Sequence, residues 1–193
     1  MKQLTIVIPN KAGQDPRLTI ESLYRQTFTD FDIIVVNDNE NNACRARNRG
    51  FKMVDTPFVL FSDNDIKWVP DALEVMYKCL VFDPSISFAW GAYELNKKIW
   101  CNREWDPEAL RERNYISGMS MVRSDHHPGW DENIRRLQDW DVWLTMLRNG
   151  YSGKYVGKVL FTTPVRDGIT RKSIPLDAAR RVIIEKHKLN VKQ

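Results

Sequence analysis

The sequence predicts an α/β fold in which helices flank a doubly wound, mostly parallel sheet. Short apolar runs alternate with amphipathic segments along the chain, and the early runs end in polar residues. No repeat, linker or low-complexity segment divides the 193 residues, a length that suits one domain. Strands that alternate with helices form a parallel sheet through right-handed crossovers.

The first part of the chain predicts three strands and the two helices between them. Residues 4–9 form an apolar run closed by proline, which is typical of a buried parallel strand. Apolar residues recur at near-helical spacing from Leu18 to Phe28, which indicates an amphipathic helix. The same patterns predict a strand at 31–36, a helix at 44–54 and a strand at 58–62.

The second part of the chain predicts further strands and helices. Asp106 followed by Pro107 begins a short helix, because aspartate caps a helix N-terminus and proline suits its first position. Asn149-Gly150 ends a helix over 138–148. The remaining elements are a helix from Pro70 to about Phe82, strands at 86–93, 115–122 and 155–163, and a helix at 176–188.

Composition and charge bound the kind of protein. No apolar run approaches the ~20 residues that span a bilayer, and the start of the chain lacks a signal-peptide core. Three widely spaced cysteines predict neither a disulfide framework nor a zinc site, so we expect a cytoplasmic protein. Residues 166–193 carry a net charge of +5. Such a basic tail can contact an anionic membrane peripherally or a diphosphate, and a solvated helix face is the alternative.

The most informative motif is Asp63-Asn64-Asp65, which ends an apolar run. Alternate side chains of a strand share a face, so the two carboxylates can converge where the strand opens into a loop. Converging carboxylates stay ionised when a cation lies near them. Mg²⁺ and Mn²⁺ prefer oxygen ligands and commonly hold a diphosphate as well. Because ligands bind beyond the carboxyl ends of such strands, we expect Pro9-Asn10 and Asn37-Asp38 at the same crevice.

A series of segments resembles, in the same order, the family 2 glycosyltransferases of the GT-A fold. They are residues 5–10, 18–27, 31–38, Ala46-Arg47-Asn48-Arg49-Gly50, Asp63-Asn64-Asp65, Gly129-Trp130-Asp131-Glu132 and 138–144. The resemblance implies a Rossmann-like, mostly parallel sheet flanked by helices, in one domain over 1–193. Within it we expect a nucleotide-binding half at 1–95, an acceptor half at 96–175 and a basic helix at 176–193.

The resemblance also implies an activity. The chain would transfer a sugar from a nucleotide-diphosphate sugar, UDP-linked by expectation, to an acceptor hydroxyl with inversion and with Mn²⁺ or Mg²⁺. The acceptor would be a glycan, lipid or protein, and no nucleic acid is expected as a partner. A catalytically silent module that binds nucleotide or glycan is the alternative, although a decayed site would have lost Asp65 or Asp139. A nucleotidyltransferase would need a glycine-rich loop near the first strand, where residues 10–13 offer one glycine.

Several residues acquire roles in donor binding from the resemblance. Asp38 can accept a hydrogen bond from a base N–H such as uracil N3, and Arg47 can donate to base or diphosphate oxygens. The alternatives are a turn aspartate and a surface arginine. Asp63 would face the sugar and Asp65 would bind the metal. The nucleotide-binding set is Pro9, Asn10, Asp38, Arg47, Asp63 and Asn64.

Asp139 is the predicted general base. An inverting transferase needs one base to take the acceptor proton, and a helix N-terminus favours a carboxylate. The alternative role for Asp139 is a helix N-cap. Gln138 stands where the family has an acidic residue, which leaves the base itself in place. The resemblance further implies Trp130, Asp131 and Trp140 on the acceptor side. It also implies Asp167 as a third metal ligand and Arg166 or Arg171 at the leaving diphosphate, and a surface loop is the alternative for this segment.

Overall fold

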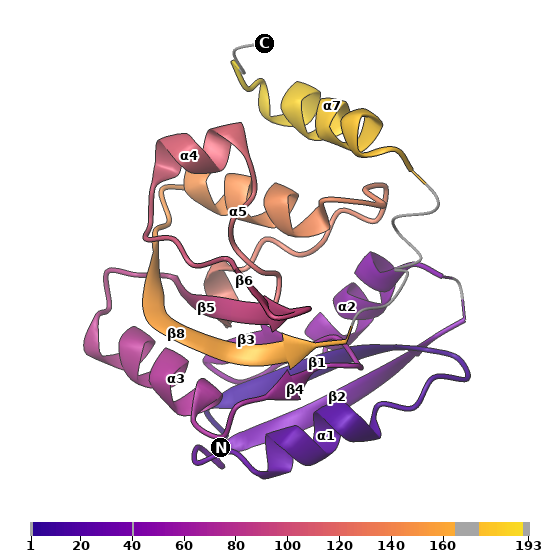
Figure 1. Ribbon diagram of the computed structural model, residues 1–193, viewed down its shortest axis with the longest axis vertical. Coiled ribbons are helices and arrows are strands. Elements are labelled where there is room, and N and C mark those ends of the chain that lie inside the picture. The colour runs from indigo at the N-terminus through magenta and orange to yellow at the C-terminus, as the bar shows by residue number, and fades with distance from the viewer. Residues whose placement is uncertain (1, 40, 165–173, 191–193) are drawn as a thin grey trace.

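The fold is built on one mixed sheet in a computed structural model that describes residues 2–39, 41–164 and 174–190. Within these residues the sheet has eight strands in the order β2-β1-β3-β7-β5-β8-β4, with β6 paired to β5 (Figure 1). The strands are β1 (Leu4–Lys11), β2 (Phe31–Asp38), β3 (Phe58–Phe61), β4 (Lys67–Trp68), β5 (Phe88–Leu95), β6 (Lys98–Trp100), β7 (Met121–Arg123) and β8 (Gly153–Thr163).

Helices cover both faces of this sheet (Figure 1). The helices are α1 (Arg17–Tyr24), α2 (Ala43–Phe51), α3 (Ala72–Phe82), α4 (Pro107–Glu112), α5 (Gln138–Arg148) and α7 (Leu176–His187), with a 3₁₀ turn η1 (Ser124–His126). Alternate strand residues feed two separate cores, as the period of a strand requires. Val7 of β1 packs in the core that contains α5 side chains, whereas Ile6 and Ile8 pack in the core with α1 and α3.

The strand directions fix where a site can form. β1 runs parallel to β2 and β3, and β5 runs parallel to β8. β7 is antiparallel to both β3 and β5, so β3 and β5 point the same way. The carboxyl ends of β1, β2, β3, β5 and β8 therefore meet at one edge of the sheet. The predicted fold of helices flanking a mostly parallel sheet is confirmed, with short antiparallel strands joining and edging the parallel sets.

The segment 115–122 is the main difference from the predicted elements. Only Met121–Arg123 forms a strand, while Tyr115 and Ile116 are buried without joining the sheet. The Ile116 carbonyl accepts a hydrogen bond from the Trp143 indole at 3.1 Å instead of a ladder bond. The short strands β4 and β6 have no counterpart among the predicted elements. No described helix has both the length and the apolar character needed to cross a membrane.

Gly50 is required by the close approach of α2 to the sheet. A Cβ atom at this position would lie 2.4 Å from Val7 Cγ1 and 3.0 Å from Val36 Cγ2. We expect Gly50→Ala to lower the free energy of unfolding by ~1–3 kcal/mol, the usual cost of overpacking, as measured by urea denaturation. Val7→Ala removes the nearest atoms, so the double variant should lose less than the sum of the two single changes. A stabilised Gly50→Ala protein, as helix propensity alone would give, would contradict this packing.

Candidate active site

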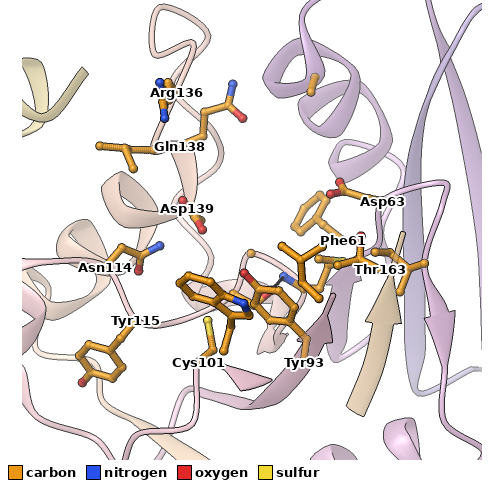
Figure 2. A pocket seen from close by; sticks show the side chains of 18 of the residues that line it. Phe61, Asp63, Tyr93, Cys101, Asn114, Tyr115, Arg136, Gln138, Asp139 and Thr163 are labelled. Atoms are coloured by element: carbon orange, nitrogen blue, oxygen red, sulfur yellow. Dashed lines mark hydrogen bonds between the residues drawn. The ribbon is translucent and has the colours of Figure 1, made fainter. Parts of the chain in front are cut away.

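A pocket of about 950 Å³ lies at the carboxyl ends of β3, β5 and β8 (Figure 2). Asp63 and Asp65 follow β3, Tyr93 belongs to the end of β5, and Thr163 ends β8. Other parts of the lining come from the segment after α4 and the start of α5, which Figure 2 shows as Asn114, Tyr115, Gln138 and Asp139, and from Cys101, which lies near Tyr93. The pocket therefore joins residues of the N-terminal βαβ units to residues far along the chain.

Arg47 connects the two walls of the pocket. Its Nη2 donates to Asp63 Oδ1 at 2.8 Å, and its Nη1 donates to the Gln138 side-chain oxygen at 3.2 Å. Its guanidinium lies over the Trp130 ring, 4.5 Å from the ring centre. The Arg47 side chain is only 12% exposed, whereas that of Asp63 is 45% exposed. Arg47 is thus a largely buried cation at the pocket wall and not a solvated surface arginine.

Asp139 is held in the pocket wall by the first turn of α5. Leu137 is the N-cap of this helix with φ of 63°, and Asp139 is its second residue, so the N-cap alternative for Asp139 is wrong. One carboxylate oxygen accepts the Trp140 backbone N–H at 3.0 Å. Burial raises the pKa of Asp139 above the ordinary aspartate value, while the Trp140 N–H, the Arg47 charge and a hydrogen bond from Asn114 oppose that rise. A carboxylate in this environment is a better base than a solvated one.

Two aspartates of the pocket offer oxygen atoms for the predicted metal ion. Asp63 and Asp65 both line the pocket and offer the oxygen atoms that Mg²⁺ and Mn²⁺ prefer. The described residues contain no group of three His, Cys, Asp or Glu side chains that could hold a metal ion. Since Mg²⁺ is commonly bound through one or two carboxylates plus substrate phosphates, two aspartates are a fitting set.

The predicted nucleotide-binding residues of β1 and β2 lie beside the pocket wall and not among its lining residues. Asp38 is buried, and its Oδ2 accepts the Asn42 backbone N–H at 2.7 Å. Asn10 accepts a hydrogen bond from the Asn64 amide at 2.6 Å and donates to Asn37 Oδ1 at 3.1 Å. This network fixes the ends of β1, β2 and β3 relative to one another. Pro9 pairs in register with Val36 inside the sheet.

The three residues expected on the acceptor side are separated by the structure. Trp130 lines the pocket beneath Arg47. Trp140 is buried in the core, where its indole donates to the Leu110 carbonyl at 2.6 Å, and it does not line the pocket. Asp131 also lies outside the pocket lining, and its carboxylate accepts from Lys186 of α7 at 2.7 Å, which lowers the Asp131 pKa.

Lys186 belongs to a charge cluster that fastens α7 to α5. It also donates to Asp141 at 2.9 Å, and the His187 ring nitrogen lies 2.7 Å from the other oxygen of that carboxylate. Asp141 and His187 are almost completely buried. Part of the basic C-terminal segment is therefore used in packing. Asp167, Arg166 and Arg171 lie outside the residues that the structure describes.

Sequence reasoning did not find several lining residues. Asn114, whose side chain lowers the pKa of Asp139, follows a short helix in an irregular segment, where no periodic pattern predicts its direction. The remaining unpredicted polar or aromatic lining residues include Tyr93, Trp100, Arg103, Arg113 and Arg136. The amino-acid composition offered one signal for these residues, because three of the five are arginines in the predicted acceptor half.

Comparison with known protein families and sequences gives a consistent result. A family model described as "Glycosyl transferase family 2" matches residues 39–127. An uncharacterized glycosyltransferase of Haemophilus influenzae is 26% identical over 184 residues, which cover 75% of this chain and 62% of the relative. The putative teichuronic acid biosynthesis glycosyltransferase TuaG of Bacillus subtilis is 25% identical over 157 residues, with 76% and 62% covered. The chain thus spans less than two thirds of these two relatives.

Solved structures share the fold over nearly the whole chain. The structure of S. aureus TarS 1-349 in complex with UDP-GlcNAc matches with a TM-score of 0.75 and 16% identity, covering 99% of this chain and 68% of TarS 1-349. The mannosyltransferase PcManGT from Pyrobaculum calidifontis, in complex with GDP-Man and Mn²⁺, matches with a TM-score of 0.66 and 13% identity, covering 96% and 61%. At these identities the likeness establishes the fold.

Proposed function

We propose that the protein transfers a sugar from a nucleotide-diphosphate sugar to an acceptor hydroxyl. The family model, the relatives and the solved structures support membership of this chain in glycosyltransferase family 2 with a GT-A fold. The observation that carries this proposal is the Asp139 carboxylate. It has a raised pKa and lines the same pocket as the Asp63 carboxylate (Figure 2) and the Asp65 carboxylate. A base and a donor-phosphate site at one sheet edge are what a direct displacement requires.

In the proposed reaction Asp139 takes the proton of the acceptor hydroxyl as its oxygen attacks the anomeric carbon of the donor. The bond from that carbon to the diphosphate oxygen breaks, the nucleoside diphosphate leaves, and the configuration inverts. No group in this step needs to form a covalent bond to the enzyme. The ion pair with Arg47 holds Asp63 in place, so that the donor sugar contacts a carboxylate in a fixed position.

Mn²⁺ or Mg²⁺ is the proposed cofactor, held by Asp65 with Asp63 beside it. When bound, the ion neutralises charge on the diphosphate. The donor nucleotide is proposed to be UDP because Asp38 can accept from the N3–H of uracil. A panel of UDP-, GDP- and dTDP-sugars, assayed by release of free nucleotide with and without added glycans, tests the function. Release from none of them by a folded protein would contradict it.

Asp38 gives a base-specific prediction. Asp38→Asn keeps an oxygen that can accept the Asn42 N–H, but it replaces the second oxygen by an NH₂ donor. Uracil presents a donor at N3 and cytosine an acceptor, so we expect wild-type protein to bind UDP about tenfold more tightly than CDP and the variant to lose or reverse this preference. Calorimetry with both nucleotides measures this preference.

Asp32→Asn, an exposed change on the same strand, is the control and should keep the preference for UDP. Equal affinities in wild-type protein would remove Asp38 from the base site.

A further inference from the structure

Two further segments, one containing Cys101 and one containing Asn114, line the same pocket as Asp139. Cys101 lines the pocket, and burial together with the charge of Asp139 raises the pKa of its thiol to about 12. Asn114, in the other segment, also lines the pocket, and its side chain lowers the pKa of Asp139. Residues next to Cys101 and Asn114 are therefore placed to contact whatever molecule brings its hydroxyl to Asp139. The lining residues of these two segments include Trp100, Arg103 and Arg113.

Two arginines bring positive charge to this wall, which also carries the Asp139 carboxylate. Arg103 is tethered, since it donates to Asp106 at 2.6 Å and lies over the Tyr115 ring at 5.5 Å from its centre. Arg113 is exposed, and no carboxylate among the described residues forms an ion pair with it. Asp106 neutralises one cation, so the charge of Arg113 remains. A guanidinium presents several N–H donors in a planar fork that matches a carboxylate or a phosphate.

Trp100 adds an aromatic surface to the same wall. It lies on β6, its relative exposure is 48%, and no described aromatic ring stacks on it. A large exposed aromatic side chain in a pocket is an apolar platform with a polar rim, which suits the C–H face of a sugar ring. An aromatic platform beside the unpaired Arg113 guanidinium and the tethered Arg103 is complementary to a sugar that carries negative charge.

We propose that Trp100, Arg103 and Arg113 form a subsite for an anionic glycan, with a sugar ring on Trp100 and a carboxylate or phosphate on the two arginines. That this glycan is the acceptor rests on the proposed function, in which Asp139 of the same pocket is the base. The binding of the anion itself does not depend on that function.

Calorimetry with three probes tests the subsite: a disaccharide ending in glucuronate, the methyl ester of the same disaccharide, and a disaccharide phosphate. The ester is neutral and otherwise matched to the uronate. We expect the wild-type protein to bind at least one anionic probe about tenfold or more tightly than the ester. The preference should weaken with added salt, because the arginines are partly exposed. The anion that binds more tightly identifies the group for which the subsite is built.

Variants locate the effect. The double change Arg103→Gln and Arg113→Gln should abolish the preference for the anion, and Trp100→Ala should weaken all three probes. Arg111→Gln is the matched control, since Arg111 lies on α4 outside the pocket lining and pairs with Glu108. Equal binding of uronate, phosphate and ester to wild-type protein, or a preference kept by the double variant, would overturn the proposal.

A UDP titration of the same samples separates this proposal from the proposed function. UDP affinity should be unchanged by the arginine and tryptophan changes. A protein that binds UDP and releases nucleotide from a UDP-sugar, but does not distinguish the anions from the ester, would overturn the subsite alone. A protein that selects the anions but binds no nucleotide or nucleotide sugar would keep the subsite and overturn both the donor and the acceptor role.

Discussion

Replacing Asp139 by asparagine is expected to lower the rate of sugar transfer by about 10²–10⁴-fold, the usual contribution of a general base. Asparagine keeps the shape of the side chain and an oxygen for the Trp140 N–H, but it cannot take the acceptor proton. UDP affinity should stay unchanged, because Asp139 lies on the wall away from the predicted nucleotide-binding strands. Steady-state kinetics and UDP calorimetry on one purified variant measure both quantities. A folded Asp139→Asn protein with full activity would contradict the assignment of Asp139 as the general base.

The raised pKa of Asp139 adds two expectations with definite signs. Because the base must be ionised, kcat/KM should fall as the pH decreases through the raised pKa, so the acid limb should lie above the ordinary aspartate value of 3.8. The folded protein holds this proton more tightly than the unfolded chain does. Protonation therefore contributes stability below the unfolded pKa, and that contribution is lost as the pH rises through the folded pKa.

At neutral pH the ionised Asp139 therefore lowers the free energy of unfolding, and replacement by the neutral asparagine removes this effect. We expect Asp139→Asn to be as stable as the wild-type protein or more stable, as measured by thermal unfolding. A capping aspartate would behave in the opposite way and lose ~1 kcal/mol on replacement. A loss of stability with unchanged activity of the folded fraction would therefore indicate a structural role.

Much of the fold could be predicted because local signals and burial agree. The bounds of α5 match the prediction from its apolar spacing and the Asn149-Gly150 stop. Asp106 caps α4 as expected, accepting the Ala109 N–H at 3.0 Å. The strand prediction failed in the first part of 115–122, where Tyr115 and Ile116 are buried in the core that contains α5 side chains and have no sheet partners. Burial alone cannot distinguish these two situations in a short apolar run.

The candidate site was predictable where strand direction determines it. Asp63 and Asp65 follow a buried strand, and parallel strands deliver their ends to one edge, so these carboxylates line the pocket. Trp140 follows Asp139 directly, but successive helix residues point about 100° apart, and this side chain turns into the core. Arg103 and Arg113 lie in irregular connections, whose paths depend on tertiary packing that no local pattern encodes.

Replacing Asp65 by alanine is expected to abolish metal-dependent transfer while the protein remains folded. A bound metal contributes several kcal/mol to such a transition state, so the loss should be at least about 10³-fold. The second readout does not involve turnover: Mn²⁺ should tighten UDP binding to the wild-type protein in calorimetry and should leave UDP binding to Asp65→Ala unchanged.

Asp63→Asn is the matched comparison for Asp65→Ala, because Asp63 is paired with Arg47 and asparagine retains an oxygen for that hydrogen bond. We expect this variant to keep a measurable Mn²⁺ effect on UDP affinity. If both variants lose the effect equally, the two aspartates hold the ion together. Wild-type turnover that survives a chelator, or Asp65→Ala protein with full activity, would remove the metal from the mechanism. Arg47 and the described arginines of the pocket would then have to neutralise the leaving diphosphate without an ion.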